Sequence, residues 1–237
     1  WNTHFVDGIT NWTADATGTS FIYGTPGIGS DVYFASSLTS TINLMTMGEN
    51  YTVNSLTVVA GASDVTMVGT ETLTIAAAQG AGITLQNGAP TTTLFTNLEL
   101  AGDQAWTNDS SNYLYITGTT VTSAGNHTLT VQGTGNTDIY SQIATGSGGL
   151  IKDGTGTLIL YNPVNTYSGG TTIKGGILAV DTAGALGLGD VTNISGTLQT
   201  TENLGGVART IFVAHNFSQM AAGTLLLQVV NSPSATP

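Results

Sequence analysis

Short stretches in which apolar and polar residues alternate recur along most of the chain. Three of them are NSLTVV (54–59), ETLTIA (71–76) and HTLTVQG (127–133), all rich in the β-branched residues that suit a pleated strand. Clusters of Gly, Asn, Asp and Ser, such as QNGAP (86–90), separate these stretches and supply turns. Helix signals are nearly absent. The pattern therefore predicts an all-β protein built from short strands.

A repeat becomes visible in the second half of the chain. Two series of aliphatic residues recur in it with a period of about 20 residues. The spacing is constant in the first series and slightly longer in the second. The members of the two series are Leu158, Leu178 and Leu198, then Ile151, Ile173 and Ile194. A two-stranded unit of this size is too small to bury its own apolar face, so consecutive units are expected to stack.

Stacked units of this kind make a parallel β-helix, a solenoid in which each coil hydrogen-bonds to the next at a spacing of about 4.8 Å. The two series are expected to form inward ladders of Leu and of Ile. Glycines in front of these strands fit the corners, where the backbone adopts dihedrals that side chains disfavour. Ten to twelve coils of about 20 residues would make a rod of roughly 50 Å. Strands in the first half follow looser intervals, so its coils are expected to be less regular.

The stretch from Gly148 to Thr200 carries a specific string of motifs. It opens with G-L-x-K-x-G-x-G-T-L-x-L, continues with N-T-Y-S-G-G-T-T-I from Asn165 to Ile173, and reaches G-G-x-L-x-V at Val180. This string closely resembles the passenger-associated strand repeat of bacterial autotransporters. The resemblance implies a right-handed parallel β-helix on, or released from, a bacterial outer membrane, where it serves as an adhesin, spacer or scaffold.

We divide the chain into an N-terminal capping segment (1–40), irregular coils (41–147), regular coils (148–230) and a linker or processed end (231–237). Exposed strand edges at the N-terminal end would recruit other chains, so this end is expected to carry an aromatic cap. The residues expected to form the cap are Trp1, Trp12, Phe21, Tyr23, Tyr33 and Phe34.

Composition narrows the range of partners. Acidic residues number 14 against 3 basic ones, which gives a net charge of -11. With only Lys152, Lys174 and Arg209 as cations, the chain has almost nothing to neutralise a phosphate backbone or an anionic membrane. The chain has no cysteine, and its apolar runs fall far short of the roughly 20 residues of a membrane-spanning helix. We expect no nucleic-acid partner, no membrane insertion by this segment and no disulfide or thiolate chemistry.

The segment AGDQAWTNDSSN (101–112) is the best local grouping of acids with an aromatic residue. In it Asp103 and Asp109 flank Trp106, which would suit a cleft that stacks a sugar between two carboxylates. The same residue types suit a plain exposed loop, and we favour the loop over the glycan site.

Other polar residues point to structure more than to chemistry. Lys152 and Lys174 are about one coil apart and are expected to stand one above the other on the outer surface, paired with Asp153 or Asp181. No histidine has a second His or Cys at metal-ligand spacing. We expect neither a metal site nor a cofactor, and weak calcium binding by turn residues such as Asp153 or Asp190 is left open.

Three functions remain after these exclusions. The favoured one is a structural or adhesive rod, extracellular or on the bacterial surface, that is not an enzyme and associates with other copies of itself or with host or biofilm components. The alternative is a carbohydrate-active enzyme or a glycan-binding module on a β-helix scaffold. The third uses outward threonine rows, such as TTTLFT (91–96) and GTTVTS (118–123), as a flat array for ice or a crystalline polymer.

Overall fold

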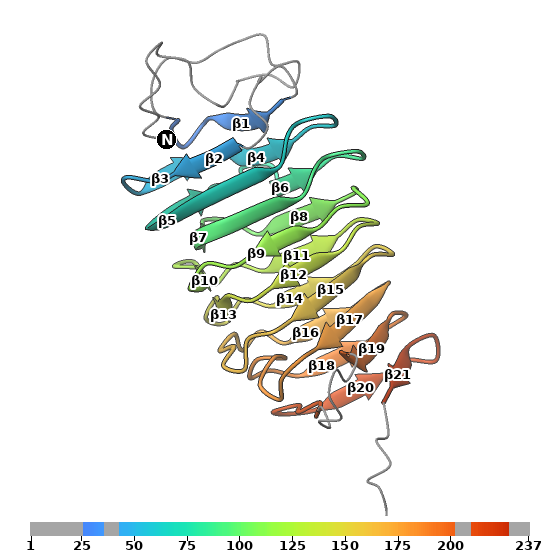
Figure 1. The fold of residues 1–237 in the computed structure, drawn as a ribbon. Helices are drawn as coiled ribbons and strands as arrows, with labels where there is room; N and C mark the ends of the chain where they lie inside the picture. Colours follow the sequence, from blue (N-terminus) through green and yellow to red (C-terminus); the bar gives the residue numbers. More distant parts are fainter. Residues whose placement is uncertain (1–25, 36–42, 202–209, 228–237) are drawn as a thin grey trace, which may run out of the picture.

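The computed structural model describes residues 26–35, 43–201 and 210–227, and in these ranges the chain forms strands and turns stacked in coils. Figure 1 shows the strands as a ladder that follows the sequence from blue to red. Neighbouring strands are parallel from the first coil to the last, for example β1 with β4, β11 with β14 and β19 with β21. The protein is therefore a parallel β-solenoid, as the repeat predicts.

Two sheets form the main faces of the solenoid. The first has nine strands, in the spatial order β1 (Asp31–Phe34), β4 (Ser55–Val58), β6 (Ala81–Leu85), β8 (Gln104–Asn108), β11 (Leu129–Gln132), β14 (Leu150–Lys152), β16 (Thr171–Ile173), β18 (Val191–Asn193) and β20 (Phe217–Gln219). The second has twelve strands: β2 (Asn43–Thr46), β3 (Tyr51–Val53), β5 (Val65–Ile75), β7 (Thr92–Leu100), β9 (Leu114–Ile116), β10 (Thr120–Thr122), β12 (Thr137–Ile139), β13 (Gln142–Ala144), β15 (Thr157–Leu160), β17 (Ile177–Val180), β19 (Thr197–Thr200) and β21 (Thr224–Leu226).

The coils are not all of one length. In the regular half Leu178 pairs with Leu198, whereas in an early coil Leu56 pairs with Ile83, which lies further along the chain. Because the early coils consume more chain, the described residues make about eight turns and not the ten to twelve that uniform short coils predicted. At about 4.8 Å a turn, this part of the rod is roughly 40 Å long.

The second sheet forks in the first half of the chain. The long strand β7 pairs with β9 through residues 92–94 and with β10 through residues 98–99. In the next two coils the long strand is replaced by two short ones, β9 and β10 and then β12 and β13. Gly118 lies at the corner between β9 and β10, where a Cβ would collide with the main-chain oxygen of Thr96. The strands that follow the corner, β10 and β13, form a third face, and β13 is the last strand on it.

The leucine series lies in one column of the interior. Leu158 pairs with Leu178, Leu178 pairs with Leu198, and all three side chains are fully buried. They belong to a core of buried apolar side chains that runs from Val32 in the first described coil to Leu198. Gly176, in the corner before β17, has a φ of 61°, in the left-handed region that favours glycine.

The isoleucine series does not form a second ladder. Ile151 pairs with Thr172 and lies on the outer face, Ile173 pairs with Lys152, and Ile194 lies beyond the end of β18 and is exposed. The register of β14 and β16 thus differs by a single position from the spacing of Ile151 and Ile173 in the sequence. A slip of this size turns a side chain to the opposite face of a strand, so the near-equal spacing of the series was misleading.

The expected aromatic cap falls mostly outside the described residues, which exclude Trp1, Trp12, Phe21 and Tyr23. Tyr33 and Phe34 lie in β1, where Phe34 is buried in the core. Across the division expected at residue 148, β11 pairs directly with β14, so one ladder connects the two regions. No helix in the described ranges is long and apolar enough to cross a membrane.

Candidate functional site

The two acids of the candidate glycan site lie at opposite ends of one strand. Asp103 directly precedes β8 and Asp109 directly follows it. An extended strand rises about 3.3 Å per residue, so the six steps between these residues separate them by roughly 20 Å. Paired carboxylates of a glycosidase stand about 5 to 9.5 Å apart. The structure therefore does not bring Asp103 and Asp109 together.

Trp106 lies inside the solenoid. It is fully buried between Ile83 and Val131 of the neighbouring coils, and its Nε1 donates a hydrogen bond of 3.1 Å to Oε1 of Gln104. A buried indole has no free face for a sugar ring, so the structure contradicts the candidate glycan site of Asp103, Trp106 and Asp109 as one constellation. The favoured exposed loop fits Asp103 and Asp109, whereas residues 104–108 between them form β8. Alternation along β8 turns Gln104, Trp106 and Asn108 inward.

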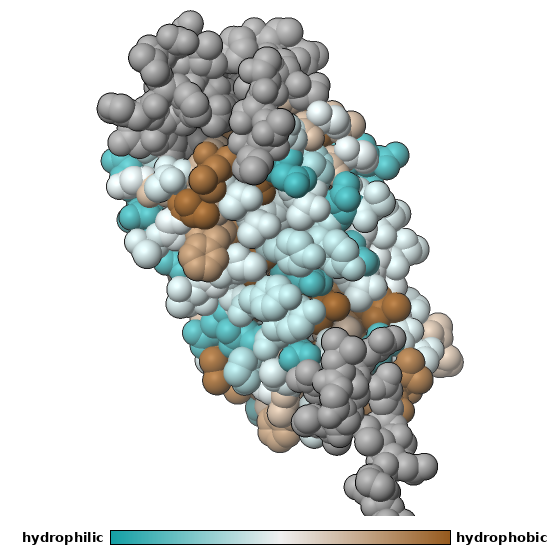
Figure 2. Space-filling model, viewed as in Figure 1, coloured by the Kyte–Doolittle hydropathy of each residue, from teal (hydrophilic) through white to brown (hydrophobic). Residues whose placement is uncertain are grey.

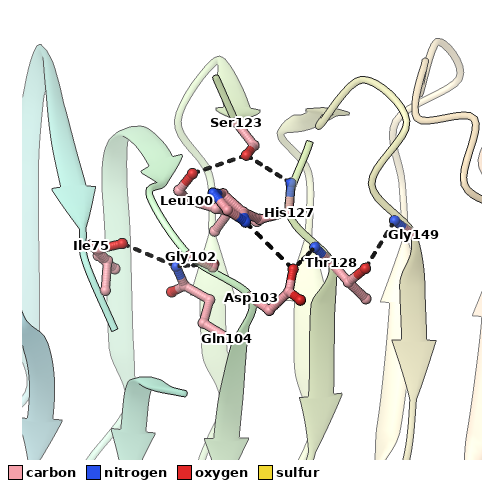
Figure 3. A network of polar contacts seen from close by, with 9 residues as sticks. All are labelled: Ile75, Leu100, Gly102, Asp103, Gln104, Ser123, His127, Thr128 and Gly149. Carbon is pink, nitrogen blue, oxygen red and sulfur yellow. Dashed lines mark hydrogen bonds and ion pairs between the residues drawn. The ribbon is translucent and has the colours of Figure 1, made fainter. Parts of the chain in front are cut away.

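Asp103 takes part in a polar network between adjacent coils (Figure 3). Its Oδ1 accepts a hydrogen bond of 2.7 Å from the main-chain nitrogen of Thr128 and lies 3.5 Å from Nδ1 of His127. The carboxylate is largely exposed, and the pair is ionic only when His127 is protonated. The network ties the turn before β11 to the preceding coil.

Ser123 completes the residue types of a catalytic triad but not its geometry. Its Oγ donates to the main-chain oxygen of Leu100 at 2.9 Å and accepts from the main-chain nitrogen of His127 at 3.0 Å (Figure 3). A triad requires the serine hydroxyl to bond to the imidazole of the base. Here the hydroxyl proton goes to a carbonyl, so the arrangement fixes a turn and does not activate a nucleophile.

A shallow depression of about 410 Å³ opens beside Asp103 on the outer face of the first sheet. Ala105, Thr130 and Ile151 pair in register across β8, β11 and β14 and lie in this depression. The depression exists because the side chain of Ala105 is small, and Asp103 and Gln132 form its polar walls. Among the residues of the candidate glycan site, Asp103 is the one that lines this depression. The depression offers a carboxylate, hydroxyls and an amide to a polar ligand.

Sequence reasoning found Asp103 but missed its partners in the depression. Thr130 and Ile151 come from the next two coils, and the piece of chain between Ala105 and Thr130 is longer than the piece between Thr130 and Ile151. Unequal offsets of this kind leave no signal in one sequence. Residues of the regular coils, by contrast, are aligned by the repeat itself.

Lys152 does not stand above Lys174 on the outer surface. It faces inward between Val131 and Ile173, is buried, and its Nζ donates to the main-chain oxygens of Asp153 at 2.5 Å and Gly175 at 3.3 Å. Burial lowers the pKa of Lys152 to about 8, against the opposing effect of the Asp153 charge. The ammonium thereby joins two consecutive coils at a corner.

The acids considered for calcium are engaged in hydrogen bonds. Oδ1 of Asp153 accepts from the nitrogen of Gly154 at 2.7 Å, and Oδ1 of Asp190 accepts from the nitrogen of Asn216 at 3.0 Å. The part of the chain that the structure describes holds no group of three or more His, Cys, Asp or Glu residues placed around one metal position.

Comparison with known protein families gives one match. The family model described as the passenger-associated-transport-repeat matches residues 150–180, which run from β14 through β17. Neither the curated proteins nor the solved structures gave a match to the chain. The repeat implies a secreted or surface-exposed protein. The chain thus carries a passenger-associated transport repeat within a parallel β-solenoid, consistent with the passenger domain of an autotransporter.

Proposed function

We propose that the protein is a structural and adhesive rod on the exterior of a bacterial outer membrane, and that it works through its shape and surfaces without catalysis. The observation that carries the proposal is the unbroken ladder: nine strands of the first sheet pair in sequence order over a continuous apolar core. Such a ladder gives a stiff element that transmits force and resists local opening. We also propose that the solenoid is right-handed, as the resemblance to the passenger-associated repeat implies.

The surface of the rod supports this role. Figure 2 shows a face that is mostly weakly coloured, with brown areas in separate patches. Outward columns of the first sheet contain threonine in successive coils, as where Thr57 pairs with Thr84 and Thr84 with Thr107. Uncharged surfaces of this kind suit contacts with host or biofilm surface components more than steering of a charged substrate.

One end of the described ladder supports association between copies. Leu225 pairs with Leu198 and continues the interior leucine column, yet it is 39% exposed. Phe217 and Leu227 lie beside it around an apolar depression of about 260 Å³. A further coil supplied by a second copy would cover these side chains and extend both sheets.

Electron microscopy of the purified protein tests the proposal. We expect rods joined end to end, and we expect Leu225→Glu to give single rods because it places a charge in the contact. Phe95→Glu, at an exposed position of β7 far from this end of the ladder, is the matched control and should leave the fibres intact. Circular dichroism verifies that both variants keep their strands. Single particles at every concentration, without attachment to cells or to biofilm material, would contradict the proposal.

Glycan binding is a second candidate function, favoured by the depression beside Asp103. Its size and its carboxylate, hydroxyl and amide groups suit a sugar that hydrogen-bonds without aromatic stacking. Binding of neutral or acidic glycans that is lost in Asp103→Asn and kept in Asp109→Asn would establish it. Hydrolysis lost in the same variant would overturn the view that the protein is not an enzyme.

A further inference from the structure

Four of the eight tyrosines lie together on the outer face of the second sheet. Tyr113 directly precedes β9 and Tyr115 lies within it, while Tyr140 and Tyr161 directly follow β12 and β15. The rings of Tyr113 and Tyr115 stack with their centroids 5.2 Å apart, and those of Tyr140 and Tyr161 stack at 4.1 Å. We call these four residues the tyrosine patch.

Asp138 is an acid on the outer face that is nevertheless buried. It pairs in register with Tyr115 on one side and Ile159 on the other, in the middle of β12. The residue is only 5% exposed, and its Oδ1 has no hydrogen-bond partner. Side chains on an outer face are normally solvated, so the burial is caused by the neighbouring residues, among which the tyrosines are the bulkiest.

No cation of the described ranges compensates the Asp138 carboxylate. Lys152 bonds to main-chain oxygens in the interior and His127 pairs with Asp103. Lys174 follows β16 in the other sheet, and His215 lies beside Asp190 next to β18 of that sheet. The fold does not require an acid here either, since Ile159 occupies the same column one coil later. An unpartnered buried carboxylate destabilises a fold, and such a group beside exposed aromatic rings is a candidate for function.

We propose that the tyrosine patch binds an organic cation, an alkylammonium or guanidinium group, which settles on the exposed rings above the Asp138 carboxylate. Tyr113 is 37% exposed and Tyr140 is 42% exposed, and each ring keeps one face that its stacking partner does not cover. Aromatic faces attract organic cations, and a carboxylate in a poorly solvated position strengthens that attraction. The net charge of -11 favours cations over anions at this surface.

The charge of Asp138 makes the binding dependent on pH. The titratable groups around it are Tyr115 on β9, Tyr140 after β12, and Tyr161 after β15 with Asp181 close to Tyr161. Burial raises the pKa of Asp138 to about 6. It also raises the pKa values of Tyr115 and Tyr161 above that of an ordinary phenol, so these two side chains carry no charge that competes with the carboxylate. A cation favours the ionised carboxylate, so affinity rises between pH 5 and pH 8.

Calorimetric titration with choline and with a hexa-arginine peptide tests the proposal. The two probes distinguish the two possible sources of the organic cation, which are small amines and basic polypeptides. We expect at least one probe to bind at pH 8. For choline, the uncharged isostere 3,3-dimethyl-1-butanol should bind at least about tenfold more weakly. Asp138→Asn should weaken binding at least about tenfold. Asp109→Asn, which removes an exposed acid beside the other sheet, should leave it unchanged.

A second pair of variants separates the ring from its hydroxyl. Tyr140→Phe should retain binding and Tyr140→Ala should lose it, with the strand content of both verified by circular dichroism. Absence of binding by both probes at millimolar concentration would overturn the proposal. Equal losses in Asp138→Asn and Asp109→Asn would also overturn it, because they would mark general attraction to an acidic protein.

Discussion

The coils before and after residue 148 solve the same structural problem in two ways. Up to β13, each coil closes its third face with backbone strands: the distal half of β7, then β10, then β13. In the next coil a side chain takes over: Asn165 Oδ1 accepts from the nitrogen of Ile143 at 2.8 Å, and its Nδ2 donates to the oxygen of Ala185 at 2.7 Å. One amide thereby replaces a strand, and the coil becomes shorter.

Both kinds of coil nevertheless share one core, and its disruption is the largest effect that we predict. Leu178→Ala, in a short coil, and Leu98→Ala, in a long one, should each lower the free energy of unfolding by about 2–5 kcal/mol, because each leaves a cavity among fully buried side chains. Urea denaturation measures both. The exposed Leu188→Ala is the control and should change stability by less than about 0.5 kcal/mol. A loss confined to one region would show that the core is not continuous.

Removing the amide tests the difference between the coils directly. Asn165→Ala should lower the free energy of unfolding by about 2–3 kcal/mol, because it leaves a buried main-chain donor and acceptor without partners. Thr166→Ala, at an exposed neighbouring position, serves as control in the same denaturation experiment. If the two variants were equally stable, the amide would not be replacing a strand.

Lys152 provides a pH test inside the short coils. Its pKa falls from 10.5 to about 8 on folding because of burial, so between these values the unfolded chain binds the proton that the folded chain has released. Stability contributed by this group therefore rises as pH increases from about 8 to 10. Denaturation at several pH values should show the rise in the wild type. Lys152→Met should abolish it, and an unchanged rise in this variant would assign it to another group.

Asp138 provides the opposite test on the outside of the long coils. Burial raises its pKa from 3.8 to about 6, so between these values the folded chain holds a proton that the unfolded chain has lost. Its contribution to stability is present at pH 4 and is lost as pH rises to about 6. Thermal unfolding of Asp138→Asn across this range should lack that loss. The same loss in the variant would contradict a buried acid at this position.

The smallest effect is expected at the exposed pair of Asp103 and His127. Because the carboxylate is largely solvated, Asp103→Asn should change the free energy of unfolding by only about 0–1 kcal/mol. Its effect on glycan binding is a separate measurement. A stability loss as large as that of Leu178→Ala would mean that the polar network holds the coils together.

The contrast between the short and the long coils also explains which features could be predicted from the sequence. Leu158, Leu178 and Leu198 are visible because the short coils keep a constant offset, whereas the isoleucine series failed by a single position in register. Charge suggested that Lys152 faces water, but carbonyls at a corner satisfy its ammonium inside. The burial of Asp138 depends on Tyr115 and Ile159 in the two neighbouring coils. Their distances along the chain from Asp138 are unequal, so no sequence repeat indicates that they are neighbours.

The stacking of the coils is tested most directly by one distance. Thr57 and Thr192 lie on the outer face of β4 and β18, six steps apart in the first sheet. Because the chain has no cysteine, Thr57→Cys and Thr192→Cys can carry two spin labels for double electron–electron resonance. Six steps of about 4.8 Å predict a narrow distribution centred near roughly 30 Å. A broad distribution, or one centred beyond about 45 Å, would contradict a continuous solenoid.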